Sequence, residues 1–287
     1  MRQALRVVVT GATGQQGGAV TRALLAQGHL VRALVRATAS PAALALQRAG
    51  VELAVGNLED PASLDRALAG ADALFGVTTP FEGLAAEADK GIALVEAARR
   101  ANLAHMVYTS ACDADRHTGI PSFERKLRVE QHLRASGVPF TIVAPVYFME
   151  NLRTPFSLAR LHEGEYARWM PLDRKLQLIT VEDIGRFCAQ VFEQREAFLG
   201  RRIDLAGDSL DGWETAAVLS RVLRREIRPV ALPLASFPAN DELSRNTATL
   251  LAWLADTGFS ADIEGLRRQY PETDWRTLEQ WAAVQGW

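Results

Sequence analysis

Short apolar runs alternate with amphipathic segments through the first half of the chain. Runs short enough for strands and rich in apolar and β-branched residues occur at Ala4–Thr10, Leu30–Val35, Val51–Val55, Ala73–Val77, His105–Ser110 and Phe140–Pro145. The segments between them have helical spacing, as in residues 15–27, 40–48, 85–101 and 123–136. This alternation predicts an α/β fold, a doubly wound parallel sheet with crossover helices.

Local signals support these boundaries. Ser40 before Pro41 and Asp60 before Pro61 are typical helix starts, because the side chain caps the helix and proline suits its first position. Gly28 and Gly137 stand where helices are expected to end.

The rhythm changes after about Asn151. Helical and loop segments dominate there, with short strands predicted near Lys175–Thr180 and Arg202–Ala206. No linker rich in Pro, Gly or Ser marks a boundary. We therefore expect a nucleotide-binding domain at residues 1–151 and a smaller, mainly helical C-terminal lobe at residues 152–287, packed on it with parts that can interleave.

Composition narrows the functional classes. The 287 residues are 48% hydrophobic and 23% charged, with a net charge of −2 and no long basic run, so direct nucleic-acid binding is not expected. Two cysteines make no disulfide framework, and no apolar stretch approaches the ~20 residues of a membrane span. We expect a cytoplasmic protein without membrane association, and the sequence leaves open whether it is a homodimer.

The strongest chemical signal is the glycine-rich segment between the first strand and the first helix. Gly11, Gly14 and Gly17 have the spacing G-x-x-G-x-x-G. In a Rossmann fold such glycines allow a tight turn, backbone approach to a pyrophosphate and close packing of the helix. The helix dipole and free N–H groups then attract phosphate, so a dinucleotide site is predicted here.

The end of the second strand bears on the choice between NADP(H) and NAD(H). NAD sites usually carry an acid there to hold the ribose 2′-hydroxyl, whereas this chain has Arg36. Arg36 could pair with the 2′-phosphate, which predicts NADP(H) in preference to NAD(H); the alternative is an arginine at the surface. Arg32, earlier in the strand, is interpreted as an exposed strand residue.

Other predicted pocket residues follow from the rule that ligands bind at the carboxyl ends of parallel strands. They are Asn57 and Leu58 after strand three, Thr78, Thr79 and Pro80 after strand four, and Ser110 after strand five.

Several segments together resemble the NmrA-like branch of atypical short-chain dehydrogenases. The loop Gly11-Ala12-Thr13-Gly14-Gln15-Gln16-Gly17-Gly18 is similar to that branch's G-A-T-G-x-Q-G-G, and Pro145–Asn151 to its P-x-Y-F-x-E-N turn. Val181–Gly185 and the C-terminal segments around Asp262 and Trp281 match as well. The resemblance implies a Rossmann domain with a cleft beside a C-terminal lobe. It also implies cofactor contacts at Gly11, Thr13, Gly14, Gln15, Gln16, Gly17 and Arg36.

The usual catalytic pair of short-chain dehydrogenases is incomplete. Their Tyr-x-x-x-Lys motif uses the tyrosine as proton donor, and here Lys126 is preceded at that spacing by Ser122. Lys126 is therefore a candidate for contact with the nicotinamide ribose or else a solvated helix lysine. Tyr147 and Phe148 are expected either over the nicotinamide ring or in the core. Cys112 is interpreted either as a redox residue or as a small buried residue. His117 is interpreted either as part of a substrate-binding cluster or as part of a hydrated loop.

Two functions follow. The first is an NADP(H)-binding redox sensor that responds to the NADPH/NADP⁺ balance and acts through a regulatory protein partner. The second is an NADPH-dependent reductase of quinones or similar small-molecule acceptors, which needs no tyrosine because the reduced acceptor can take its proton from water. The missing tyrosine favours the sensor.

Overall fold

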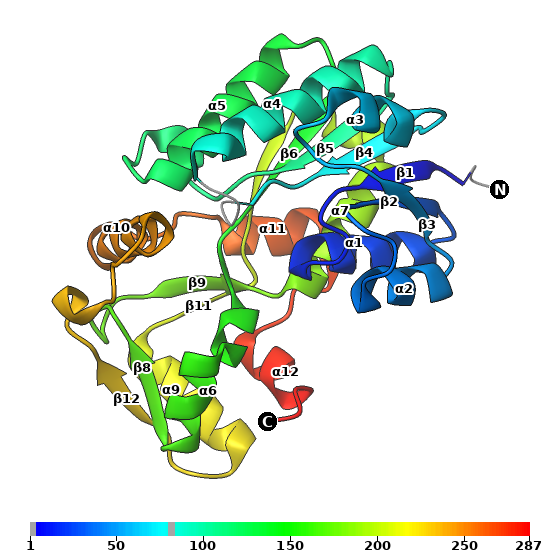
Figure 1. The fold of residues 1–287 in the computed structure, drawn as a ribbon. Coiled ribbons are helices and arrows are strands. Elements are labelled where there is room, and N and C mark those ends of the chain that lie inside the picture. Colours follow the sequence, from blue (N-terminus) through cyan, green and yellow to red (C-terminus); the bar gives the residue numbers. More distant parts are fainter. Residues whose placement is uncertain (1–3, 80–83) are drawn as a thin grey trace.

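A central sheet of seven parallel strands organises the computed structural model, which describes residues 4–79 and 84–287 (Figure 1). The strand order is β10-β6-β5-β4-β1-β2-β3. The bounds are Arg6–Val9 for β1, Leu30–Val35 for β2, Glu52–Val55 for β3, Ala73–Gly76 for β4, His105–Thr109 for β5, Phe140–Pro145 for β6 and Arg202–Leu205 for β10. The predicted doubly wound parallel sheet is confirmed.

Helices cover both faces of this sheet, which explains why its strands are mainly apolar on both sides. Helices α1 (Gln15–Ala26), α2 (Pro41–Arg48) and α7 (Val181–Glu193) pack on one face, through residues such as Val20 and Phe187. Helices α3 (Pro61–Leu68), α4 (Leu84–Arg100) and α5 (Pro121–Ala135) cover the other, through residues such as Leu64 and Leu133.

The local signals act as expected. The Ser40 side chain accepts a hydrogen bond from the N–H of Ala43 at 3.2 Å, and Asp60 accepts one from the N–H of Ala62 at 3.0 Å. Strands β2 and β6 have the predicted bounds.

The C-terminal lobe has its own core and two small sheets. One sheet holds β7 (Tyr147–Phe148), β9 (Leu176–Ile179) and β11 (Asp208–Leu210), and the other pairs β8 (Glu165–Arg168) with β12 (Arg228–Ala231). Helices α6 (Pro155–His162), α9 (Gly212–Leu223), α10 (Glu242–Asp256) and α12 (Leu278–Ala283) surround them. The remaining α-helices of the described residues are the short α8 (Arg195–Phe198) and α11 (Ile263–Gln269).

The second half of the chain also completes the first sheet. Strand β10 pairs in parallel with β6, and α7 packs on α1 so closely that a Cβ at Gly185 would lie 2.6 Å from the carbonyl oxygen of Ala19. The strand predicted near Arg202–Ala206 therefore lies in the large sheet. In the described part of the chain, no helix has both the length and the apolar character needed to cross a bilayer.

Candidate functional site

The glycine-rich loop is a narrow turn that backbone contacts hold in place. Thr10 Oγ1 donates to the carbonyl oxygen of Val77 at 3.1 Å and accepts from the N–H of Val77 at 2.8 Å, which ties the loop to the end of β4. Gly11 has a φ of 62°, in the left-handed region that favours glycine. A Cβ at Gly17 would lie 2.3 Å from the carbonyl oxygen of Gly11, so α1 can approach the loop only with glycine there.

The first turn of α1 is suited to an anion. Gly14 caps the helix without a side-chain hydrogen bond, and the first turn contains no acidic residue. Thr13, Gly14 and Gln15 are exposed. Free N–H groups and the positive end of the helix dipole are therefore accessible to a phosphate, and the glycine cradle that a Cβ would fill fits a pyrophosphate.

The neighbouring strand ends bring further predicted residues to the same edge of the sheet. Arg36 follows β2 and is exposed, and Asn57 follows β3 with its Oδ1 accepting from the N–H of Glu59 at 2.7 Å. Leu58 packs against the apolar cluster beneath α3 and α4. Since β1, β2 and β3 are adjacent, Arg36 and Asn57 lie on the side of the glycine loop that the adenosine half would occupy.

Arg32 corrects one interpretation. It is buried, with 9% of its surface exposed, and its Nη1 donates to the carbonyl oxygens of Ala67 and Ala69 at 2.7 and 2.8 Å. Its Nε lies 2.8 Å from Glu52. The interpretation of Arg32 as an exposed strand residue is wrong, because these partners let a long cationic side chain lie inside the fold.

Lys126 is held in a network of buried groups. Its Nζ lies 3.1 Å from Glu87 Oε1 and donates to the carbonyl oxygen of Thr78 at 3.4 Å. The side chains of Lys126 and Glu87 are 14% and 1% exposed, so the alternative of a solvated helix lysine does not describe Lys126. Burial lowers the lysine pKa, but the nearby Tyr108 and Glu87 outweigh this and raise it, so the ammonium stays charged.

Tyr108 and Glu87 are members of this network that sequence reasoning missed. Tyr108 is completely buried on β5, with its hydroxyl 3.3 Å from Thr78 Oγ1 and its ring under the Lys126 ammonium at 5.9 Å. Burial raises the pKa of Tyr108. The sequence does contain one indication of Glu87, because it is an acid on the buried face of an amphipathic helix. A buried carboxylate normally requires a cationic partner.

A cavity of about 670 Å³ opens between the large sheet and the C-terminal lobe. Gln16, Ser110 and Lys126 line it at the sheet, and Tyr147 and Phe148 line it from β7. Gln16 is fixed by Thr109, whose hydroxyl donates to Gln16 Oε1 at 2.8 Å. Ser110 Oγ is buried and bonds to no described residue, so its hydrogen-bonding capacity is unused. Burial raises the pKa of Tyr147 to about 12.

The remaining predicted residues lie around this cavity or apart from it. Thr78 is buried behind Lys126, whereas Thr79 is exposed. Pro80 lies outside the described residues. Ser122 is buried, and its N–H donates to Asn246 Oδ1 at 2.9 Å, so it occupies the position of the absent tyrosine without lining the cavity.

Two other candidate side chains are explained by packing or exposure. Cys112 is fully buried, and burial raises the pKa of its thiol, so little thiolate forms. His117 is 75% exposed and lies 3.8 Å from Glu124. Within the described residues, no group of three His, Cys, Asp or Glu side chains is arranged to hold a metal ion.

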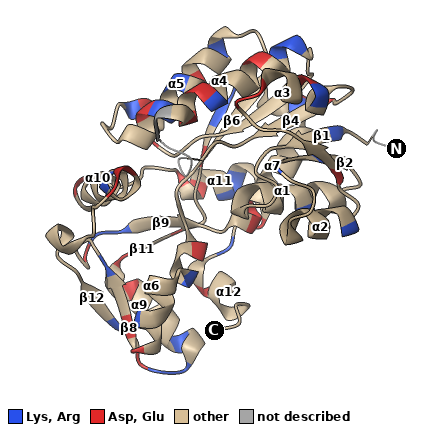
Figure 2. Cartoon of the chain, in the orientation of Figure 1, with Lys and Arg blue, Asp and Glu red and all other residues tan. Residues whose placement is uncertain are grey.

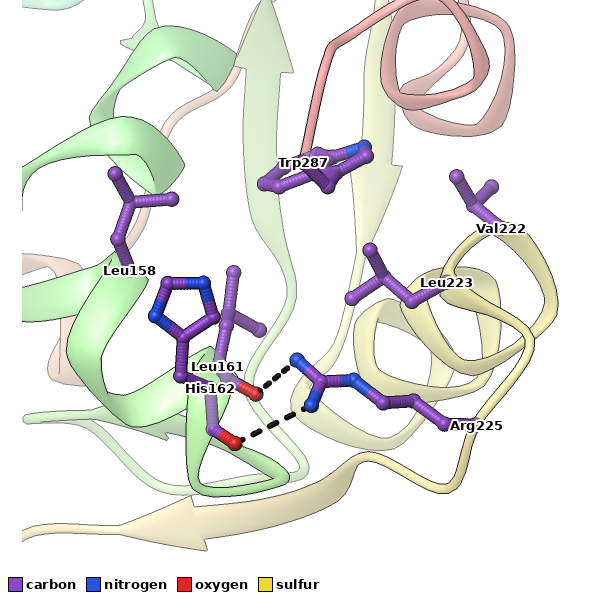
Figure 3. Close-up of a pocket in the computed structure, with 7 residues that line it drawn as sticks. All are labelled: Leu158, Leu161, His162, Val222, Leu223, Arg225 and Trp287. Carbon is purple, nitrogen blue, oxygen red and sulfur yellow. Dashed lines mark hydrogen bonds between the residues drawn. The ribbon is translucent and has the colours of Figure 1, made fainter.

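A second, smaller cavity of about 390 Å³ lies inside the C-terminal lobe (Figure 3). Leu158, Leu223 and Trp287 form apolar walls. The arginine in its lining, Arg225, already donates hydrogen bonds within the protein. They go to the carbonyl oxygens of Leu161 and His162, at 2.7 and 3.2 Å, at the end of α6. Acidic and basic residues are interspersed along the chain, as α4 and α5 show most clearly (Figure 2).

Comparison with known proteins gives the site a context. The model of the NmrA-like family matches residues 3–282. A "NAD(P)H azoreductase" of Xenophilus azovorans is 31% identical over 230 residues, which cover 79% of this chain and 77% of that protein. The "nitrogen metabolite repression protein nmrA" of Emericella nidulans is 29% identical over 253 residues, covering 83% of this chain and 71% of that protein.

Solved structures share the fold. The triphenylmethane reductase of Citrobacter sp. with NADP(H) superposes with a TM-score of 0.85 at 22% identity, over 98% of this chain and 100% of that one. The negative transcriptional regulator NmrA with NADP gives a TM-score of 0.83 at 24% identity, over 99% and 95%. NmrA has also been solved with NAD. At these identities the likeness establishes the fold.

Proposed function

The chain belongs to the NmrA-like family, and from that premise we propose that it is an NADPH-dependent reductase of quinones or similar planar acceptors. The observation that carries this proposal is the 670 Å³ cavity, which begins at Gln16 beside the glycine loop and contains Ser110 and Lys126. A protein that only binds a dinucleotide has no need of a second, largely apolar cavity next to it. The reductase names among its relatives add support.

The residues that would hold NADPH fall in two groups. The pyrophosphate would contact the N–H groups of Thr13 and Gln15, since that of Gly14 already donates to the Gly11 carbonyl oxygen at 2.8 Å, and the 2′-phosphate would pair with Arg36. Towards the cavity, the Lys126 ammonium would bind the nicotinamide ribose while Glu87 keeps it charged and in place. When bound, NADPH supplies the hydride.

The missing tyrosine fits an acceptor of this kind. A quinone accepts a hydride on a carbonyl oxygen or ring carbon, and the reduced oxygen can take a proton from water, so no protein acid is required. The Ser110 hydroxyl can donate to the acceptor carbonyl, and Tyr147 and Phe148 provide apolar surface against its ring. Alcohol–ketone chemistry, which needs the tyrosine, is not proposed.

Steady-state oxidation of NADPH, followed at 340 nm with 2-methyl-1,4-naphthoquinone, tests the proposal. We expect turnover by the wild type and a loss of tenfold or more in kcat/KM in Lys126→Ala. Arg128→Ala is the control, because it lies on the same helix with its side chain 59% exposed. Absence of turnover with a series of quinones and azo compounds would rule out the reductase.

Cofactor preference has a separate test. Charge-assisted hydrogen bonds from Arg36 are worth roughly 1.5–3 kcal/mol each, so Arg36→Ala is expected to weaken NADPH about ten- to hundredfold and leave NADH nearly unchanged. Arg48→Ala, at an exposed position on α2, serves as control. Calorimetric titration that finds equal losses for both cofactors would contradict the 2′-phosphate assignment.

A redox sensor is the second candidate, and one observation favours it. Ser122 stands where the catalytic tyrosine would be, so the chain lacks the usual proton donor, and the Ser122 backbone N–H donates to Asn246 of α10. A sensor would bind NADPH and NADP⁺ with clearly different affinities, turn over no acceptor and engage a regulatory protein in one state. Similar affinities for the two forms would exclude it.

A further inference from the structure

The far end of the interlobe cavity contains a buried arginine whose hydrogen-bonding capacity is mostly unused. Arg168, on β8, is 6% exposed and lines the cavity. Its Nη2 donates to the carbonyl oxygen of Arg174 at 2.9 Å, which fixes the guanidinium. Its Nε and Nη1 are buried and have no hydrogen-bond partner of normal geometry among the described residues, and the Tyr166 hydroxyl is the polar group that interacts with the guanidinium beside them.

A guanidinium in this state is unusual because arginine remains charged in proteins. Buried charges are normally paired with a carboxylate, as Lys126 is with Glu87. Among the described residues, none forms an ion pair with Arg168, and no Asp or Glu is among those that line the cavity. Lys126 and Arg168 are the charged residues of this lining, and both are cations.

The surroundings of Arg168 indicate the shape of a ligand as well as its charge. The neighbouring Trp169 has a buried Nε1 that likewise bonds to no described residue, which adds a third unused donor on the same segment. The Trp169 ring stacks on Phe156 with 4.5 Å between centroids and meets Phe237 edge-on at 5.0 Å, and all three rings line the cavity. Nearer the sheet, Phe123 and Phe259 stack at 6.5 Å and also line it.

We propose that the cavity accepts a planar, conjugated acceptor that carries an anionic group, and that Arg168 binds this group. The proposal rests on the proposed reductase function and names its substrate class. The reducible end lies towards Ser110 and Lys126, the rings lie between the aromatic walls, and a carboxylate, sulfonate or phosphate receives hydrogen bonds from Nε and Nη1 of Arg168. The bidentate geometry of a guanidinium suits such oxyanions.

Two pairs of probes test the inference. For turnover, 2-methyl-1,4-naphthoquinone-6-sulfonate, whose sulfonate is on the ring away from the reducible carbonyls, is compared with the neutral 2-methyl-1,4-naphthoquinone at saturating NADPH. For binding without chemistry, calorimetry compares 2-naphthalenesulfonate with the neutral 2-naphthalenemethanol. We expect Arg168→Met to lower kcat/KM for the sulfonated quinone about ten- to hundredfold, mainly through KM, and to change the neutral quinone less than about twofold.

Matched variants separate recognition from folding. Arg228→Met removes an arginine from the adjacent strand β12, where the side chain is 66% exposed, and is expected to leave both quinones unchanged. Arg168→Lys keeps the buried charge without the two-pronged donor and is expected to be intermediate for the sulfonate. Should Arg168→Met not fold, the lysine variant carries the comparison.

The outcomes distinguish the two proposals. Equal losses for charged and neutral quinones, or no loss for either, would overturn the anion site. If the wild type reduces neither of these quinones nor any acceptor of the wider series, the reductase proposal fails. The binding pair still tests the anion site: tighter binding of naphthalenesulfonate that depends on Arg168 supports it. Equal binding of the two naphthalenes would overturn it.

Discussion

Gly17 and Gly14 make different contributions to the same loop. A Cβ at Gly17 would meet the backbone of Gly11, at 2.3 Å from its carbonyl oxygen, whereas a Cβ at Gly14 would lie 3.3 Å from that oxygen. Backbone cannot rotate away as a side chain can. The glycine at position 17 is therefore a packing requirement, and the glycine at position 14 leaves the surface open for a phosphate.

The two positions give a paired prediction. Gly17→Ala is expected to lower the free energy of unfolding by about 1–3 kcal/mol, in the range of overpacked sites. Gly14→Ala is expected to cost less stability than Gly17→Ala, because its Cβ would lie 3.3 Å from the Gly11 oxygen, and to lose NADPH affinity, because its methyl group stands where the pyrophosphate would approach. Urea denaturation and calorimetry measure the two effects. A Gly14→Ala variant with wild-type affinity would show that phosphate binds elsewhere.

His105 predicts a pH dependence of stability. Its Nε2 lies 2.9 Å from Thr141 Oγ1 in the core, and burial, with a smaller contribution from Arg195, lowers its pKa from the ordinary 6.5 to about 4. Between these values the unfolded chain binds a proton that the folded chain does not. His105 therefore makes stability fall as the pH is lowered from 6.5 to 4, by up to about 3 kcal/mol.

The substitution His105→Gln isolates this effect, since glutamine keeps an N–H donor and does not titrate. We expect the difference in unfolding free energy between pH 7 and pH 4.5 to be smaller in the variant than in the wild type. His162→Gln, at an exposed position, is expected to leave that difference unchanged. Parallel pH profiles for wild type and His105→Gln would mean that His105 is protonated in the folded state.

At the scale of elements, the contact between α1 and α7 links the glycine loop to the second half of the chain. Gly185 of α7 lies against the Ala19 carbonyl of α1, and a Cβ there would be 2.6 Å from that oxygen. Gly185→Ala is expected to destabilise the protein by about 1–3 kcal/mol and to weaken NADPH as well, because α1 must shift. Gly286→Ala, where no atom lies within 4 Å of the added Cβ, is the control. Lower stability with unchanged NADPH affinity would show that the loop tolerates movement of α1.

The elements of the first half could be predicted from sequence because their signals are local. Apolar runs gave β2 and β6 with their observed bounds, and the caps at Ser40 and Asp60 act as expected. The placement of β10 beside β6 could not be predicted in this way. Its apolar residues require a buried position, but hydrophobic periodicity does not specify which sheet edge a strand joins.

The residues of the candidate site also differ in whether the local sequence predicts them. The glycine loop is a contiguous motif, and the structure leaves its helix terminus open to an anion. Lys126 was identified by its spacing from Ser122, but its partner Glu87 is on another helix, and a single sequence does not specify which cation a buried acid pairs with. Arg168 was missed because nothing in the sequence distinguishes it from an exposed arginine. Its burial among aromatic residues is visible only in the structure.

At the scale of the whole molecule, the two halves of the sequence do not form two independent bodies. Helix α7 contributes Ile184, Phe187 and Val191 to the same apolar cluster as Val20 and Leu24 of α1, and β10 covers the edge of β6. A fragment of residues 1–151 would expose that face of the sheet and leave β6 as an unprotected edge. Both features disfavour an independent fold.

We therefore expect the full chain to unfold in one transition and the fragment 1–151 to show no cooperative melt, with or without NADPH. All six tryptophans lie between Trp169 and Trp287, so their fluorescence reports the second half of the chain, whereas far-ultraviolet circular dichroism reports both halves. The two signals should give the same urea midpoint, and NADPH should shift both equally even though the glycine loop contains no tryptophan, since a ligand stabilises every part of the cooperative unit that it binds. Separate midpoints, with only the dichroism responding to NADPH, would instead mean that the C-terminal lobe unfolds on its own and that the interlobe cavity can open without loss of the dinucleotide site.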